Sequence, residues 1–133
     1  MVIWSIKNKY IKKMITYKIY SDENKSNWDN FIDISSNGTL FNYRTFIDYH
    51  ENPDFKDMSL IFYKKNRIVS VLPAGLVGDQ FISHPGTSFG GFIHKQNLSF
   101  NDANNITIAF KGFLAKYTFS NVKITLTPRC YDV

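Results

Sequence analysis

The segment MSLIFYKKNRIVSVLPA, residues 58–74, restricts the fold more than any other part of the chain. Two runs rich in β-branched, aromatic and aliphatic residues, Met58–Tyr63 and Arg67–Leu72, flank the polar residues 64–66. This pattern predicts an antiparallel β-hairpin. Pro73 is expected to end or bend the second strand, because proline cannot donate to a strand ladder.

Three more strands are predicted from alternation. Residues 15–20, ITYKIY, alternate and are rich in β-forming residues. A shorter strand is expected around Asp79–Ser83. Near the C-terminus, NVKITLTP places Val122, Ile124 and Leu126 on the expected buried face of a last strand.

The segment SNWDNFIDISSNG, residues 26–38, predicts a short helix. Ser26 is the expected N-cap, with Asp29 three residues later as its capping-box partner. Gly38 is the expected left-handed stop. The apolar residues that share one helical face are Trp28, Phe31 and Ile32.

Two further helices are predicted. A short one over residues 40–50 ends before Asn52-Pro53. The longest signal covers residues 99–120, with Ser99 as N-cap and Asp102 as its partner. Apolar residues recur in it at steps of three and four: Ala103, Ile106, Phe110, Phe113, Leu114 and Tyr117.

The predicted order is β-α-α-β-β-β-α-β, an α/β fold with a mixed sheet and flanking helices. At 133 residues the chain suffices for one domain with one core. The single cysteine, Cys130, excludes an internal disulfide and favours a reducing, cytoplasmic compartment. No apolar run approaches the ~20 residues of a spanning helix, and residues 1–14 do not resemble a signal peptide.

The net charge of +5 derives largely from lysines near the N-terminus. Such a segment can attract nucleic acid or anionic lipid, but a solvated basic tail is the favoured interpretation. The rest of the chain shows no basic stripe, so no nucleic-acid partner is expected.

The histidines and the cysteine lack metal-ligand spacing, so no metal is expected. His84 could act as a general base, because the imidazole titrates near neutrality. A hydrogen-bonding loop residue is the favoured interpretation. Cys130 is expected to be inert, and no pair of carboxylates indicates glycoside chemistry.

The stretch SHPGTSFGGF, residues 83–92, holds three of the seven glycines. It matches neither the P-loop nor the dinucleotide-binding pattern, which argues against a phosphate cradle. Its glycines allow close approach of a ligand to the backbone, and its hydroxyls, imidazole and aromatic ring suit a sugar or peptide. A ligand-binding loop and a plain connection are equally favoured by composition alone.

Three segments carry a family resemblance: WDNFIDISSNGTLFNYRTFIDYH, DMSLIFYKKNRIVSVLPA and ISHPGTSFGGF. In this order they resemble the N-terminal half of GNAT-superfamily acyltransferases of the Fem-like kind. That group includes aminoacyltransferases of peptidoglycan bridge synthesis and sugar N-acetyltransferases of surface-polysaccharide pathways. The resemblance covers roughly residues 16–131, and NGTLF with YH and SHPG with GGF are its most specific parts.

The resemblance implies transfer of an acyl group, most often acetyl from acetyl-CoA, to an amine of a sugar or cell-wall precursor. Direct attack of the amine on the thioester would need positioning and a base. The base is unassigned, with His84 and His50 as weak candidates. The implied acceptor contacts are Tyr49, His50, Ser83, His84, Gly86, Thr87, Ser88, Phe89, Gly90 and Gly91.

The superfamily's acyl-CoA pyrophosphate motif, (R/Q)-x-x-G-x-(G/A), is absent from this chain. Fem-like proteins carry the donor site largely in a second half. The sequence therefore resembles a truncated or split first half, with residues 1–14 as a basic extension and 15–133 as the acceptor-side domain. The alternative is a non-catalytic module that binds a glycan or a partner. An uncovered sheet edge would favour self-association.

Overall fold

The computed structural model describes residues 15–49, 54–87 and 90–126. In this part of the chain the strands form two four-stranded sheets, ordered β1-β3-β4-β7 and β2-β5-β6-β8. The strands are β1 (Thr16–Ile19), β2 (Phe55–Asp57), β3 (Leu60–Lys64), β4 (Arg67–Leu72), β5 (Ala74–Val77), β6 (Gln80–Ser83), β7 (Ile93–His94) and β8 (Asn121–Lys123). The helices are η1 (Asp22–Asn24), α2 (Lys25–Ile34), η2 (Leu40–Asn42), α3 (Arg44–Tyr49) and α4 (Phe100–Lys116).

The chain passes from one sheet to the other at three places between consecutive strands. β2 continues into β3, β4 into β5 across Pro73, and β6 into β7 across residues 84–92. If each pair counts as one bent strand, the order is the predicted β-α-α-β-β-β-α-β. The predicted hairpin is confirmed, because β3 and β4 pair antiparallel around residues 65–66. The prediction missed β2, β5 and β7 as separate strands, and with them the division into two sheets.

A serine replaces ladder hydrogen bonds at the bend beside Pro73. The Ser59 hydroxyl donates to the carbonyl oxygen of Ala74 at 3.2 Å and accepts from the Ala74 amide at 3.1 Å. The Met58 amide also donates to the Ala74 carbonyl, at 2.9 Å. Ser59 is buried, so these bonds keep polar backbone groups satisfied at a point where Pro73 has no N–H to offer.

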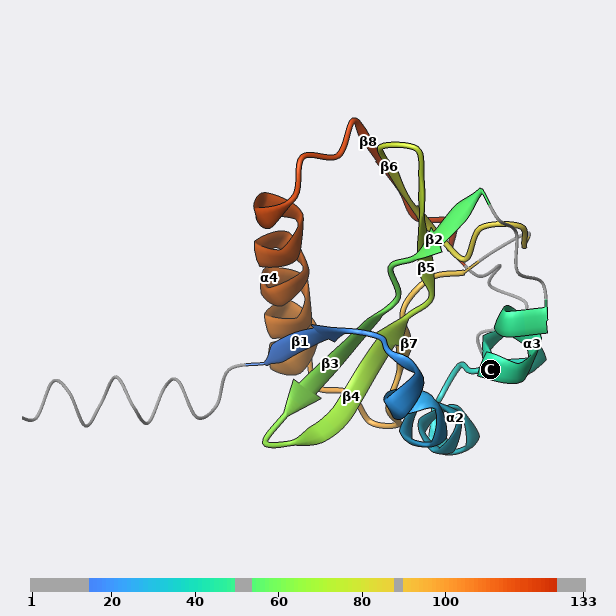
Figure 1. Ribbon diagram of the computed structural model, residues 1–133. Helices are drawn as coiled ribbons and strands as arrows, with labels where there is room; N and C mark the ends of the chain where they lie inside the picture. The colour runs from blue at the N-terminus through green and yellow to red at the C-terminus, as the bar shows by residue number, and fades with distance from the viewer. Residues whose placement is uncertain (1–14, 50–53, 88–89, 127–133) are drawn as a thin grey trace, which may run out of the picture.

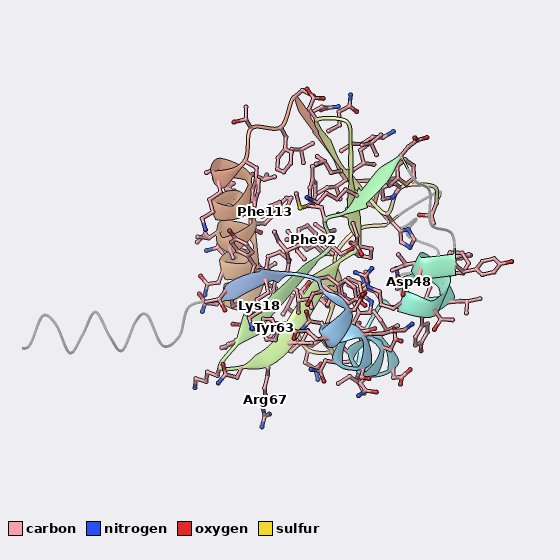
Figure 2. The ribbon with its side chains drawn as sticks, viewed as in Figure 1. Lys18, Asp48, Tyr63, Arg67, Phe92 and Phe113 are labelled. Atoms are coloured by element: carbon pink, nitrogen blue, oxygen red, sulfur yellow. The ribbon has the colours of Figure 1, made fainter. Side chains whose placement is uncertain are left out.

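The helices cover opposite faces of the β1-β3-β4-β7 sheet, with α4 on one side and α2 and α3 on the other (Figure 1). On the α4 side, aromatic rings from strand and helix interdigitate. Figure 2 shows Phe113 and Phe92 pointing into the space between α4 and the strands. The buried residues of this cluster are Ile15, Met58, Leu60, Phe62, Val69, Leu72, Ala74, Phe81, Ile106, Phe110 and Phe113.

The α2 side of the sheet buries a smaller cluster. Its members are Tyr20, Trp28, Phe31, Ile32, Ile61, Val71 and Ile93. The predicted apolar face of the first helix is confirmed, because its three predicted residues are all in this cluster.

The predicted ends of this helix were wrong. α2 begins at Lys25, so Ser26 lies inside the helix instead of capping it. The 3₁₀ turn η1 precedes α2. Ser21 caps η1 together with Asn24. Asp29 accepts from the Arg44 amide at 2.8 Å instead of completing a capping box. The helix ends at Ile34, four residues before Gly38, with Ser35 as its extended C-cap.

The predicted helix and its N-cap are confirmed for α4, but the helix ends at Lys116 instead of residue 120, and Tyr117 follows it with 39% of its surface exposed. The Asp102 side chain binds Lys64 instead of completing the predicted capping box. Ser99 is the N-cap and its hydroxyl accepts from the Asp102 amide at 3.1 Å. Ile106, Phe110 and Phe113 are buried as the spacing predicted. The last strand is shorter than predicted, and β8 (Asn121–Lys123) pairs parallel with β6 at the edge of the second sheet. Its predicted buried face was wrong, because Val122 is 38% and Leu126 72% exposed.

Candidate functional site

The predicted ligand loop connects β6 to β7 at the place where the chain passes between the two sheets (Figure 1). Both of its ends are bound to Thr125. The Ser83 hydroxyl accepts from the Thr125 amide at 3.0 Å, and the Gly90 amide donates to the Thr125 carbonyl at 2.8 Å. The segment after β8 therefore holds the two ends of the loop in place.

His84 anchors this loop to η2. Its backbone has a φ of +40° and its side chain is buried. Ring Nε2 lies 2.5 Å from the carbonyl oxygen of Phe41. Because a carbonyl oxygen can only accept, Nε2 donates this bond. The backbone amide of His84 also donates to the Pro73 carbonyl at 2.8 Å. His84 thus joins the loop, the strand bend and η2.

Glycine is required at two positions of the loop for different reasons. Gly86 has a φ of +86°, which side chains rarely tolerate. At Gly90 a Cβ would overlap the Cβ of His84. Between them, Thr87 closes a turn, since its hydroxyl donates to the His84 carbonyl at 2.9 Å. The loop is a hydrogen-bonded turn built around His84.

The predicted acceptor contacts fall into three groups. Ser83, His84, Gly86, Thr87, Gly90 and Gly91 lie in the loop, as their numbering requires. Tyr49 ends α3 with 85% of its surface exposed. His50, Ser88 and Phe89 lie outside the described residues.

The structure joins the loop to the η2–α3 segment through Phe41. The Phe41 ring packs edge-on against Phe46 of α3, with centroids 5.1 Å apart. The Phe41 carbonyl binds His84. The resemblance placed the loop and the end of α3 at one cleft; the contacts described here link the loop to Phe41 of η2, and Phe41 to Phe46 of α3. The loop and the η2–α3 segment form our candidate acceptor site.

Sequence reasoning missed a buried arginine behind this site. Arg44, the first residue of α3, is fully buried, and its guanidinium carbon lies 3.3 Å from the ring centroid of Tyr20. Nη1 donates to Asp57 at 2.6 Å and lies 4.0 Å from Asp48. Figure 2 shows Asp48 at α3. The spacing of Arg44 and Asp48 at i and i+4 was the one available signal.

Asp57 connects this arginine to the strand bend. One carboxylate oxygen binds Arg44 and the other accepts from the Ser59 amide at 2.9 Å. The Tyr20 hydroxyl, and Nε and Nη2 of Arg44, are buried and have no hydrogen-bond partner within the described part of the chain. Burial raises the pKa of the Tyr20 hydroxyl, and this effect exceeds the lowering caused by the positive charge of Arg44.

The residues at the N-terminus of α4 do not fit the diphosphate of an acyl-CoA donor. Helix N-termini bind phosphate because their amides and dipole attract anions. Here the buried carboxylate of Asp102 lies in the first turn and binds Nζ of Lys64 at 2.8 Å. The preceding residues 95–99, KQNLS, contain no glycine that would let a phosphate approach the backbone closely.

Among residues 15–49, 54–87 and 90–126, no cluster of three or more His, Cys, Asp or Glu side chains could hold a metal ion. No helix within these ranges combines the length and apolar character needed to cross a bilayer.

Comparison with protein-family models found no match, and neither did comparison with curated proteins. Two solved structures are similar in fold. The ribosomal-protein-S18-alanine N-acetyltransferase from Escherichia coli aligns with 77% of this chain at 5% identity (TM-score 0.52). A GNAT family acetyltransferase from Staphylococcus aureus aligns with 87% of this chain at 9% identity (TM-score 0.52).

The aligned region spans 59% of the Escherichia coli protein and 89% of the Staphylococcus aureus protein. At these identities the likeness concerns the fold. The mixed sheet, the bent strands and the flanking helices therefore form the GNAT acyl-CoA N-acyltransferase fold that the sequence predicted.

Proposed function

We propose that residues 15–133 form the acceptor-side domain of an N-acyltransferase, with residues 1–14 as a basic extension. The whole enzyme would move an acyl group, acetyl in the first instance, from CoA to an amine of a sugar or cell-wall precursor. The observation that carries this proposal is the GNAT fold combined with a loop that is built around His84 and tied to the η2–α3 segment. The Fem-like resemblance supplies the acceptor class.

In this proposal the acceptor lies against the loop and α3. The exposed Tyr49 offers an apolar ring face to the acceptor. His84 has a positioning role, because its Nε2 already donates to the Phe41 carbonyl. His50 is then the better of the two weak candidates for the base that removes the amine proton.

The test compares two glycine variants. In Gly90→Ala the new methyl group collides with His84 and displaces the loop, whereas a methyl group at Gly112 in α4 meets nothing within 4 Å. Acetyl transfer from acetyl-CoA to amino sugars is measured with the full-length gene product by release of the CoA thiol. We expect Gly90→Ala to lower kcat/KM about tenfold or more, a loss of ~1.4 kcal/mol of transition-state stabilisation, and Gly112→Ala to retain activity. Absence of transfer to every amine tested would refute the proposal.

A second candidate is a non-catalytic module that binds a glycan or a partner protein. The occupied N-terminus of α4 favours it, because that helix offers no open place for donor phosphates. Calorimetry separates the candidates. If an amino sugar and its N-acetylated form bind with equal affinity and no acetyl transfer is detected, the chain is a non-catalytic binding module.

A further inference from the structure

We propose that Asp102 acts as a built-in anion that closes the N-terminus of α4 to the phosphates of an acyl donor. The donor would then bind outside this domain. This inference rests on the proposed function, because only an acyltransferase has an acyl donor to exclude. Its test measures anion binding and does not depend on catalysis. Its basis is the set of groups gathered around one buried carboxylate.

Two groups at this place attract negative charge. The first is the N-terminus of a 17-residue helix, whose amides and dipole favour anions. The second is the Lys64 ammonium, which comes from β3 and lies 2.8 Å from the Asp102 carboxylate. The Asp102 side chain is 5% exposed, so water screens both attractions only weakly. Together they form an anion site that the chain itself occupies.

The ion pair between Lys64 and Asp102 joins distant parts of the chain, so it forms only when the tertiary fold is in place. Lys64 and Asp102 are 38 residues apart. Ser99 separately fixes the first turn of α4 by accepting from the Asp102 backbone amide. The helix is therefore capped without the Asp102 carboxylate, and the carboxylate is left to neutralise Lys64.

A phosphate that entered this place would meet the negative charge of Asp102 in a poorly hydrated setting. It could bind only by displacing the carboxylate from Lys64. Replacement by asparagine keeps the size and shape of the side chain but removes the charge. The Lys64 ammonium and the helix N-terminus would then be free to bind an external anion.

The experiment follows the amide NMR signals of residues 99–103 while CoA or inorganic phosphate is added. In the wild-type chain we expect no saturable shift of these signals. In Asp102→Asn we expect saturable phosphate binding, about tenfold tighter than any binding by the wild type. In the double variant Lys64→Met/Asp102→Asn, the gain should disappear.

Two outcomes overturn the inference. One is saturable binding of CoA at these amides in the wild-type chain, a result that stands whether or not Asp102→Asn folds. The other is a folded Asp102→Asn variant, judged by circular dichroism, that binds phosphate no better than the wild type. A lack of acetyl transfer would affect only the proposed function, because phosphate binding is measured without an acceptor.

Discussion

The two faces of the β1-β3-β4-β7 sheet are filled in different ways. On the α4 face, aromatic rings pack against one another, as those of Tyr17 in β1 and Phe113 in α4 do with centroids 5.5 Å apart. On the α2 face, the buried guanidinium of Arg44 packs against the rings of both Tyr20 and Trp28 and binds Asp57. The first face is stabilised by area removed from water. On the second face, stability depends on whether the buried Arg44 keeps its carboxylate partner Asp57. The η2–α3 segment lies on this second face.

The largest effect is expected on the α4 face. Phe113 is fully buried and touches rings from β1, β6 and its own helix. Phe113→Ala should lower the free energy of unfolding by about 4 kcal/mol, through lost burial and the cavity left behind. Urea denaturation measures this. Phe100→Ala is the matched control, because Phe100 lies on the same helix with 89% of its surface exposed. A loss of less than half the expected value would mean that the aromatic cluster collapses into the space.

The α2 face should respond asymmetrically to loss of either partner of its ion pair. Asp57→Asn leaves the buried guanidinium of Arg44 without its closest counter-charge, and we expect a loss of about 3 kcal/mol. Arg44→Met leaves Asp57, whose side chain is 42% exposed, to be hydrated. We expect about 1 kcal/mol there, since methionine fills much of the same space. The two chains are compared by urea denaturation at pH 7. The reverse order would show that the pair contributes net stabilisation.

The smallest effect is a gain. The buried Tyr20 hydroxyl has no hydrogen-bond partner in the described part of the molecule. Tyr20→Phe should therefore raise the free energy of unfolding by about 1 kcal/mol at neutral pH. Burial raises the pKa of Tyr20 above 10.0, so the wild type retains its stability below pH 10 and loses it as the pH rises through the folded-state pKa.

Thermal unfolding between pH 9 and 11.5 tests this pH dependence. Tyr20→Phe should lose less stability than the wild type over that range. Some loss should persist, because burial also raises the pKa of Tyr63 and a hydrogen bond to Asp33 raises that of Tyr43. Identical pH profiles for variant and wild type would contradict the assignment.

Elements defined by local pattern were predictable from the sequence. The spacing of apolar residues in α4 and the polar turn between β3 and β4 can both be read from residues that are close together in the sequence. β5 and β7 were missed because AGLV and IH carry weak strand signals, and their pairing partners define them. The start of α2 was misplaced because a 3₁₀ turn with its own capping residues precedes it.

The candidate site was located by its glycines, but its construction was not predictable. The bond from His84 to Phe41 joins residues 43 apart, and that from Thr125 to Ser83 joins residues 42 apart. Arg44 was not singled out, because nothing in its neighbourhood of the sequence shows that its guanidinium packs against Tyr20 and binds Asp57. Long-range polar contacts of this kind have no periodic signature.

The hydroxyl of Ser59, which both donates to and accepts from Ala74, has a consequence for how the chain could change length over evolution. It fixes which residue of one bent strand stands opposite which residue of the other. Insertion of one residue between β2 and β3, or beside Pro73, would shift that pairing and turn the side chains of a whole strand to the opposite face. The turn at residues 65–66 has no such constraint, so length variation among distant relatives should collect there and spare the bend.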